Sequence, residues 1–114
     1  MRIDECPVRA TANVIGGKWK PLILHSLKAG ARHYGELQRT IPDAPKKVLT
    51  DQLRELEQDG IVLRKVHGQK APRVAYSLTS YGRTLAPILR LMAAWGEKHK
   101  RVRVQGAERL ATKG

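Results

Sequence analysis

The sequence predicts an α+β fold that is mostly α, in which helical segments precede a β-hairpin and a long helix follows it. The first observation is a change of period, because apolar residues recur every three or four positions before residue 60, then alternate, then return to helical spacing. The second is that glycines and prolines stand where the period changes. The chain's 114 residues suffice for one domain around a single core.

The first two predicted helices cover residues 6–15 and about 18–28. Pro7 and Pro21 each fall in a first helical turn, where the missing N–H costs little. Gly16-Gly17 ends the first helix, and Ala29-Gly30 suits a left-handed cap at the end of the second. The expected apolar stripes are Val8, Ala12 and Ile15 in the first helix and Trp19, Leu22, Ile23 and Leu27 in the second.

A short helix, His33–Thr40, and a longer one, Pro45–Gln58, are predicted next, separated by the tight connection 41–44. Leu49, Leu53 and Leu56 stand at i, i+4 and i+7, which predicts a narrow buried seam with a polar remainder. Asp59-Gly60 ends this helix.

The hairpin is predicted from strands Ile61–His67 and Arg73–Leu78, with the turn Gly68–Pro72 between them. Thr79 is a suitable N-cap for a last helix to about Lys100, in which Pro87 should produce a kink or a shift. We assign residues 1–100 to one domain and 101–114 to a basic, mobile tail. A short helix, a tight turn, a polar-faced helix and a basic hairpin together describe a winged helix-turn-helix.

Charge indicates the class of partner. Lys and Arg number 22 against 10 Asp and Glu, a formal net charge of +12, and the pI is near 10.5. Such a charge attracts polyanions, although it also serves solubility alone in many small basic proteins. Apolar runs such as Leu22–Leu24 are far shorter than the roughly 20 residues that span a bilayer, and no apolar targeting segment follows Met1. With the single cysteine Cys6, this predicts a cytoplasmic protein without a membrane role.

The outward face of the helix Pro45–Gln58 is the predicted DNA-reading surface, because the second helix of a helix-turn-helix enters the major groove. Lys46 and Lys47 lie in its first turn, where the helix dipole disfavours cations unless a phosphate lies nearby. Thr50 and Arg54 are the candidates for contact with bases or phosphates. Asp51 either accepts a hydrogen bond from cytosine or orients Arg54. The alternative is a merely solvated charged face.

The hairpin carries a second basic group, for which contact with the minor groove or with phosphates is predicted. Its members are Arg64, Lys65, His67, Lys70 and Arg73. The alternative is that these are edge-strand charges that deter aggregation.

No enzyme, cofactor or metal site is predicted. The four histidines have no metal-ligand spacing to one another or to Cys6, and no paired carboxylates, nucleophile motif or phosphate loop is present. The rival classes are a winged-helix protein-interaction module and an RNA-binding winged domain, the second disfavoured by an aromatic content of 4%.

Several motifs in order resemble the HxlR-type family of bacterial transcriptional regulators, which are relatives of the MarR group. They include Cys6-Pro7-Val8, Gly16-Gly17-Lys18-Trp19, Tyr34-Gly35-Glu36-Leu37, the run 47–60, the run 72–79 and Trp95-Gly96. The resemblance spans about residues 5–100. It implies a homodimer joined through its N- and C-terminal helices, bound to duplex DNA at a pseudo-palindromic operator as repressor or activator. The chain departs from the family at Pro45, where a serine-like cap is usual, and at His33-Tyr34, where Arg-Phe is favoured.

The dimer and a sensor are the remaining expectations. The last helix presents more apolar surface than a monomer of this size covers, so the dimer residues expected are Trp19, Leu85, Leu89, Met92 and Trp95. The two recognition helices should then lie about 34 Å apart. In part of the family a cysteine at the place of Cys6 responds to oxidants or electrophiles. A position before a helix favours the thiolate, whereas a partly buried packing residue is the alternative.

Overall fold

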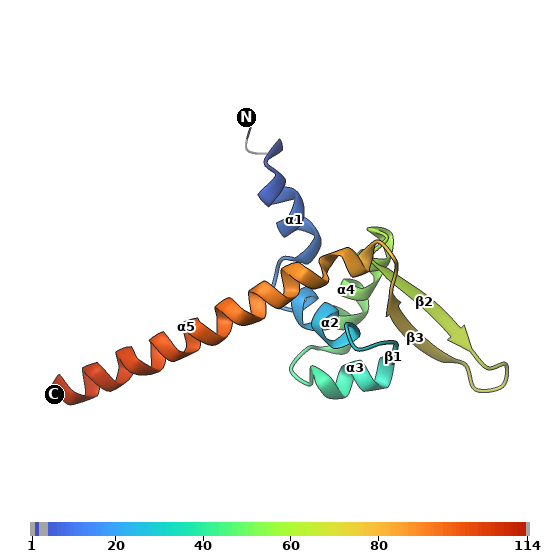
Figure 1. Ribbon diagram of the computed structural model, residues 1–114. Coiled ribbons are helices and arrows are strands. Elements are labelled where there is room, and N and C mark those ends of the chain that lie inside the picture. Colours follow the sequence, from blue (N-terminus) through green and yellow to red (C-terminus); the bar gives the residue numbers. More distant parts are fainter. Residues whose placement is uncertain (1, 3–4, 114) are drawn as a thin grey trace.

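The computed structural model describes residue 2 and residues 5–113, and its fold is the predicted winged helix-turn-helix (Figure 1). The elements in chain order are α1 (Pro7–Ile15), α2 (Lys20–Leu27), β1 (Arg32–His33), α3 (Tyr34–Thr40), α4 (Lys46–Gln58), β2 (Val62–His67), β3 (Arg73–Leu78), the 3-10 helix η2 (Gly82–Leu85) and α5 (Ala86–Lys113). The β2–β3 hairpin points away from the helices on one side, and α5 extends away on the other.

The core lies where α2, α3, α4 and the base of the hairpin meet. Ile23, Leu24, Leu37, Leu49 and Leu56 are fully buried there. The predicted seam of α4 is confirmed, because Leu53 is also buried. The predicted stripe of α2 is partly wrong. Leu24 is buried instead of Leu22, which stays 46% exposed.

Both early helices have a proline in the first turn, as predicted. Pro7 is the first residue of α1 and Pro21 the second of α2. The predicted stripe of α1 is not buried as a whole, since Val8 is 76% exposed and only Ile15 reaches the core. The face of α1 that carries Val8 and Ala12 is therefore exposed, while Val14 and Ile15 pack against the core.

The entry into α3 is held by Glu36. The backbone N–H of His33 donates to Glu36 Oε1 at 2.9 Å, which satisfies a donor at the helix start. This hydrogen bond is the main reason why the pKa of Glu36 is lowered, and the nearby cations Arg32 and Arg39 act in the same direction. Residues 41–45 connect α3 to α4, and Ile41 in this connection is buried.

The sheet has three antiparallel strands in the order β1-β3-β2. The hairpin register pairs Arg64 with Tyr76 and His67 with Arg73, and the predicted β3 is confirmed to the residue. The strand β1 was not predicted, because two residues are too few to show alternation. It forms only through pairing of Arg32 with Tyr76 and of His33 with Ala75.

The predicted last helix differs at both ends. Thr79 Oγ1 accepts a hydrogen bond from the Gly82 N–H at 2.8 Å and donates to the Gly60 carbonyl at 2.6 Å, so it closes the turn that leads into the 3-10 helix η2 and does not cap an α-helix. The α-helix starts at Ala86, which places Pro87 second, where its missing N–H does no harm. It then continues to Lys113. The separation of residues 101–114 as a mobile tail stays a prediction.

Within residue 2 and residues 5–113, no helix combines the length and the apolar character that a membrane crossing requires.

Candidate nucleic-acid interface

The first half of α4 presents a row of charged side chains to solvent. Lys46 and Lys47 are exposed in the first turn, as predicted. Lys47 Nζ lies 3.3 Å from Asp51 Oδ2, and Asp51 Oδ1 lies 3.9 Å from an Arg54 guanidinium nitrogen. Asp51 therefore stands between two cations, which favours its orienting role. The side chains of Lys47 and Arg54 are 87% and 65% exposed, so both remain free to exchange Asp51 for a phosphate or a base.

Tyr34 joins the two helices of the helix-turn-helix. Its hydroxyl lies 3.1 Å from Thr50 Oγ1 and donates to the carbonyl of Lys46 at 3.3 Å. The hydroxyl thus contacts the first turn of α4 and the candidate base-reading side chain Thr50 together. The contact of Tyr34 with Thr50 follows only from the crossing of α3 and α4.

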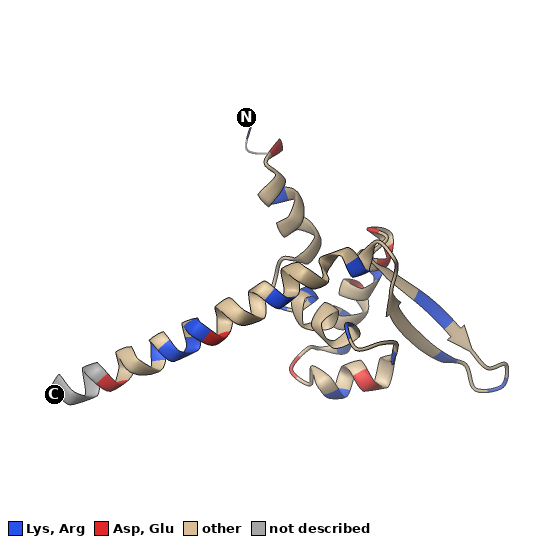
Figure 2. Ribbon diagram, viewed as in Figure 1, with Lys and Arg blue, Asp and Glu red and all other residues tan. Residues whose placement is uncertain are grey.

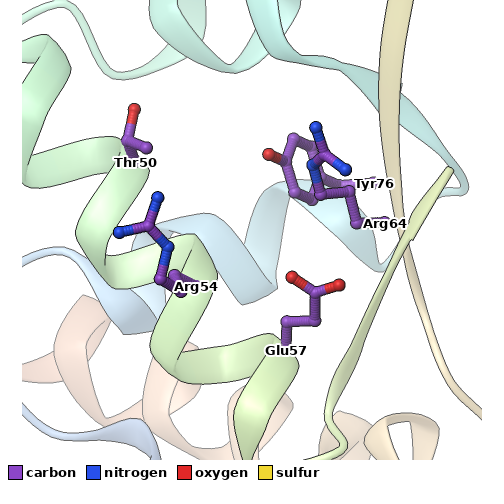
Figure 3. A pocket seen from close by; sticks show the side chains of 5 residues that line it. All are labelled: Thr50, Arg54, Glu57, Arg64 and Tyr76. Atoms are coloured by element: carbon purple, nitrogen blue, oxygen red, sulfur yellow. The ribbon is translucent and has the colours of Figure 1, made fainter. Parts of the chain in front are cut away.

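A cleft separates α4 from the hairpin (Figure 3). Its volume is about 330 Å³. Thr50, Arg54 and Glu57 line it from α4, and Arg64 and Tyr76 line it from paired positions on the hairpin. The three α4 residues stand at i, i+4 and i+7, one position after the buried leucines, and this spacing was the signal by which Glu57 could have been found.

Chemically, the cleft has two guanidinium groups that favour an anion and one carboxylate that opposes it. Arg54 and Arg64 approach from opposite walls, and Glu57 lies beside them. A phosphate bound between the two arginines would accept charge-assisted hydrogen bonds from both.

The β2–β3 hairpin is the wing of this fold, and it carries the remaining basic residues. Figure 2 shows Lys and Arg along the hairpin and at its loop. Lys65, Lys70 and Arg73 are exposed there. His67 is also exposed, and its ring lies 6.4 Å, centroid to centroid, from that of His33 in an edge-to-face arrangement. The wing therefore continues the positive surface that begins on α4.

The residues expected at a dimer interface separate into two groups. Leu89 is 3% exposed and belongs to the core of its own chain, and Leu85 and Trp19 pack against that core. Their apolar surface is thus used within the monomer. Met92 and Trp95 remain free, at 42% and 67% exposed. Ile88, which the sequence places on the same apolar stripe of the last helix, is also exposed, at 38%. Val8, Tyr81 and Leu91 are exposed apolar side chains that were not among the residues expected at the interface.

Cys6 occupies the N-cap position of α1 and is partly buried. Its place before the first helical turn is the one predicted from Pro7. Among residue 2 and residues 5–113, no cluster of three or more His, Cys, Asp or Glu side chains is arranged to hold a metal ion.

Comparison with known proteins identifies the relatives of this arrangement. The model of the HxlR-like helix-turn-helix family matches residues 14–103. The HTH-type transcriptional regulator YdeP of Bacillus subtilis is 47% identical over 97 residues, which cover 85% of this chain and 76% of YdeP. The HTH-type transcriptional regulator YybR of the same organism is 48% identical over 99 residues, covering 87% of this chain and 79% of YybR.

Two solved structures share the fold. The redox regulator HypR in its reduced form superposes with a TM-score of 0.82 at 47% identity, covering 85% of this chain and 96% of HypR. The diamide-treated form of YodB from B. subtilis superposes with a TM-score of 0.69 at 35% identity, covering 82% and 92%. YdeP and YybR are described as HTH-type transcriptional regulators, YodB as a transcriptional regulator and HypR as a redox regulator.

Proposed function

The chain belongs to the HxlR-like helix-turn-helix family of transcriptional regulators, and from this premise we propose that it is a homodimeric repressor that binds a pseudo-palindromic operator. The observation that carries the proposal is the exposed cationic surface that runs from the first turn of α4 through the cleft to the wing. Repression is proposed because it needs only occupancy of a promoter, whereas activation needs a further contact with the transcription machinery.

The roles proposed for the individual side chains follow from their places. Arg54 and Thr50 face the groove from the middle of α4 and read base edges, and Asp51 orients Arg54. A backbone phosphate lies between Arg54 and Arg64 when DNA fills the cleft. Phosphate contacts alone are assigned to the cations that flank this centre, namely Lys46, Lys47, Lys70 and Arg73.

The homodimer is supported by the free apolar face of α5. Ile88, Met92 and Trp95 follow one another at spacings of four and three and are 38%, 42% and 67% exposed. His99 and Val102 continue the same spacing, and the rings of Trp95 and His99 stack at 5.0 Å. Such a seam on a helix that extends away from the domain is the pattern by which two helices pack together. A second copy would bury it together with Val8 of α1.

The DNA-binding proposal is tested by fluorescence anisotropy with two duplexes, a random one and one enriched from genomic fragments bound by the protein. Affinity for random duplex should fall by roughly two or more orders of magnitude between about 50 and 200 mM salt. Arg54→Ala should reduce the preference for the enriched duplex by about 1–3 kcal/mol. Arg90→Ala on α5 is the matched control. Weak binding at both salt concentrations would indicate a protein-interaction module instead.

Redox control through Cys6 is a separate part of the proposal, supported by its N-cap position and by the redox regulators among the relatives. Because Cys6 is the single cysteine, an oxidised dimer forms by joining the two Cys6 sulfurs. Diamide accepts the two electrons and the two thiol protons and becomes the hydrazine. The expected result is a reducible covalent dimer with altered operator affinity. Unchanged affinity after diamide, together with unaltered behaviour of Cys6→Ser, would overturn this part.

A further inference from the structure

A second cavity, of about 420 Å³, lies between the end of α2, the end of β3, η2 and the start of α5, and it shares no lining residue with the cleft between α4 and the hairpin. One wall is the connection from Lys28 to Ala31. Gly30 has φ +141°, which lets the chain turn from α2 into β1 and so shapes this wall. Ser77 and Leu78, Arg83 and Ala86 complete the lining above Leu27.

The floor of this cavity is apolar. Leu27 is 2% and Leu78 is 7% exposed, so both belong to the core, and they present carbon atoms to the cavity. Alanine side chains at 29, 31 and 86 are too short to fill the space above them. The cavity is in the size range of small-molecule sites, which combine an apolar lining with a few polar groups.

The charge of the lining is of one sign. Lys28 and Arg83 are its two charged residues, and both are exposed at the rim. The clefts around Arg54, Arg39 and Lys100 each contain a glutamate as well, whereas none of the residues that line this cavity is acidic. Neither Lys28 nor Arg83 forms an ion pair within residue 2 and residues 5–113.

We propose that this cavity binds a small organic monoanion, an aryl or alkyl carboxylate. The apolar body packs on Leu27, Leu78 and Ala86, and the carboxylate accepts charge-assisted hydrogen bonds from Lys28 and Arg83. The Ser77 hydroxyl is a further donor within the lining. Lys28 and Arg83 have no carboxylate partner among the described residues of the chain, and the ligand supplies a carboxylate.

Bound there, the anion would contact the base of the wing through β3 and the base of the proposed dimer helix through α5. An effect on operator affinity follows only if the anion binds more tightly to one arrangement of these elements. That coupling rests on the proposed function, whereas binding of the anion does not. The experiment therefore measures anion binding on the free protein.

The probe is 2-naphthoate, titrated into the full chain and followed by calorimetry and by the amide NMR shifts of Ala31 and Ser77. Saturable binding of one naphthoate per chain, with a Kd below about 1 mM, is expected from its size. The neutral isostere 2-naphthamide should bind about tenfold more weakly, because it cannot make charge-assisted hydrogen bonds.

Two variants locate the site. Lys28→Gln combined with Arg83→Gln should weaken naphthoate binding about tenfold, while Lys98→Gln combined with Arg101→Gln makes the same charge change on α5 and should leave binding unchanged. Ala31→Leu fills the cavity without removing a charge and should also weaken binding about tenfold. Both site variants alter exposed residues, and their unfolding temperatures provide the check of folding.

Absence of saturable binding would overturn the proposal, as would equal affinity for naphthoate and naphthamide or equal loss in the α5 control pair. If naphthoate binds as expected to a chain that fails the salt-dependence test with duplex DNA, the site stands and the proposed function fails.

Discussion

Lys20 Nζ lies 2.6 Å from Glu55 Oε2, which joins the first turn of α2 to the side of α4 away from the cleft. The Lys20 side chain is only 10% exposed, whereas that of Glu55 is 52% exposed. The pair thus holds α4 to α2 through one buried cation and one accessible carboxylate. Gln52 Nε2 donates to the same carboxylate oxygen at 3.5 Å.

Glu55→Gln should lower the free energy of unfolding by about 1–2 kcal/mol, because it leaves the buried Lys20 charge unpaired; the effect is below that of a fully buried pair since Glu55 is half in water. Lys20→Met keeps the apolar stem and removes the charge, and should cost less than about 1 kcal/mol. Urea unfolding of both variants measures the difference. A Glu55→Gln variant as stable as the native chain would show that the pair contributes nothing.

Tyr34→Phe removes the hydroxyl that contacts Thr50 and the Lys46 carbonyl. The free energy of unfolding should fall by about 0.5–1.5 kcal/mol, the ordinary net value of such a hydrogen bond. Tyr81→Phe is the matched control, because Tyr81 is 66% exposed, and it should change stability by less than about 0.5 kcal/mol. Equal effects of the two substitutions would mean that Tyr34 does not connect α3 to α4 energetically.

Glu57→Gln should increase affinity for random duplex DNA about three- to tenfold at 50 mM salt, because the carboxylate beside Arg54 and Arg64 repels phosphate. Glu97→Gln makes the same charge change on α5 and should alter affinity less than about twofold. Anisotropy titrations at two salt concentrations provide the comparison. If both variants bind equally, the cleft does not hold a phosphate.

Met92→Glu combined with Trp95→Glu should convert the protein to a monomer at micromolar concentration, because two charges would enter the apolar seam. Arg90→Glu changes charge on the opposite face of the same helix and should leave the dimer intact. Sedimentation velocity distinguishes the two outcomes. A native chain that sediments as a monomer would overturn the dimer itself.

Glu36 should make a pH-dependent contribution to stability. Its folded pKa is lowered below the ordinary value of 4.5, mainly by the hydrogen bond from the His33 N–H. The unfolded chain therefore binds the proton more tightly, so the contribution is complete above about pH 4.5 and is lost as pH falls through the folded pKa. The stability difference between the native chain and Glu36→Gln, measured by urea unfolding from pH 7 to pH 3, should shrink accordingly.

The sequence by itself was enough for the order of the five α-helices and the hairpin, the seam of α4 and the β3 strand. In each, a local period of apolar residues coincides with burial on one face, as at Leu49, Leu53 and Leu56. It was also enough for the motifs that place the chain in its family. Pro7, Pro21 and Gly30 act through their own backbone, so their effects could be predicted from single positions.

Only the tertiary structure decided which side chains meet. The strand β1 exists because Tyr76 and Ala75 offer it a partner, and its two residues carry no period of their own. Glu57 faces Arg64 across a cleft that depends on the angle between α4 and the hairpin. Leu89 is core and Trp95 is surface although both lie on the apolar side of one helix, because the domain covers α5 only near its start. Periodicity specifies a face, whereas contact depends on what the rest of the chain places against it.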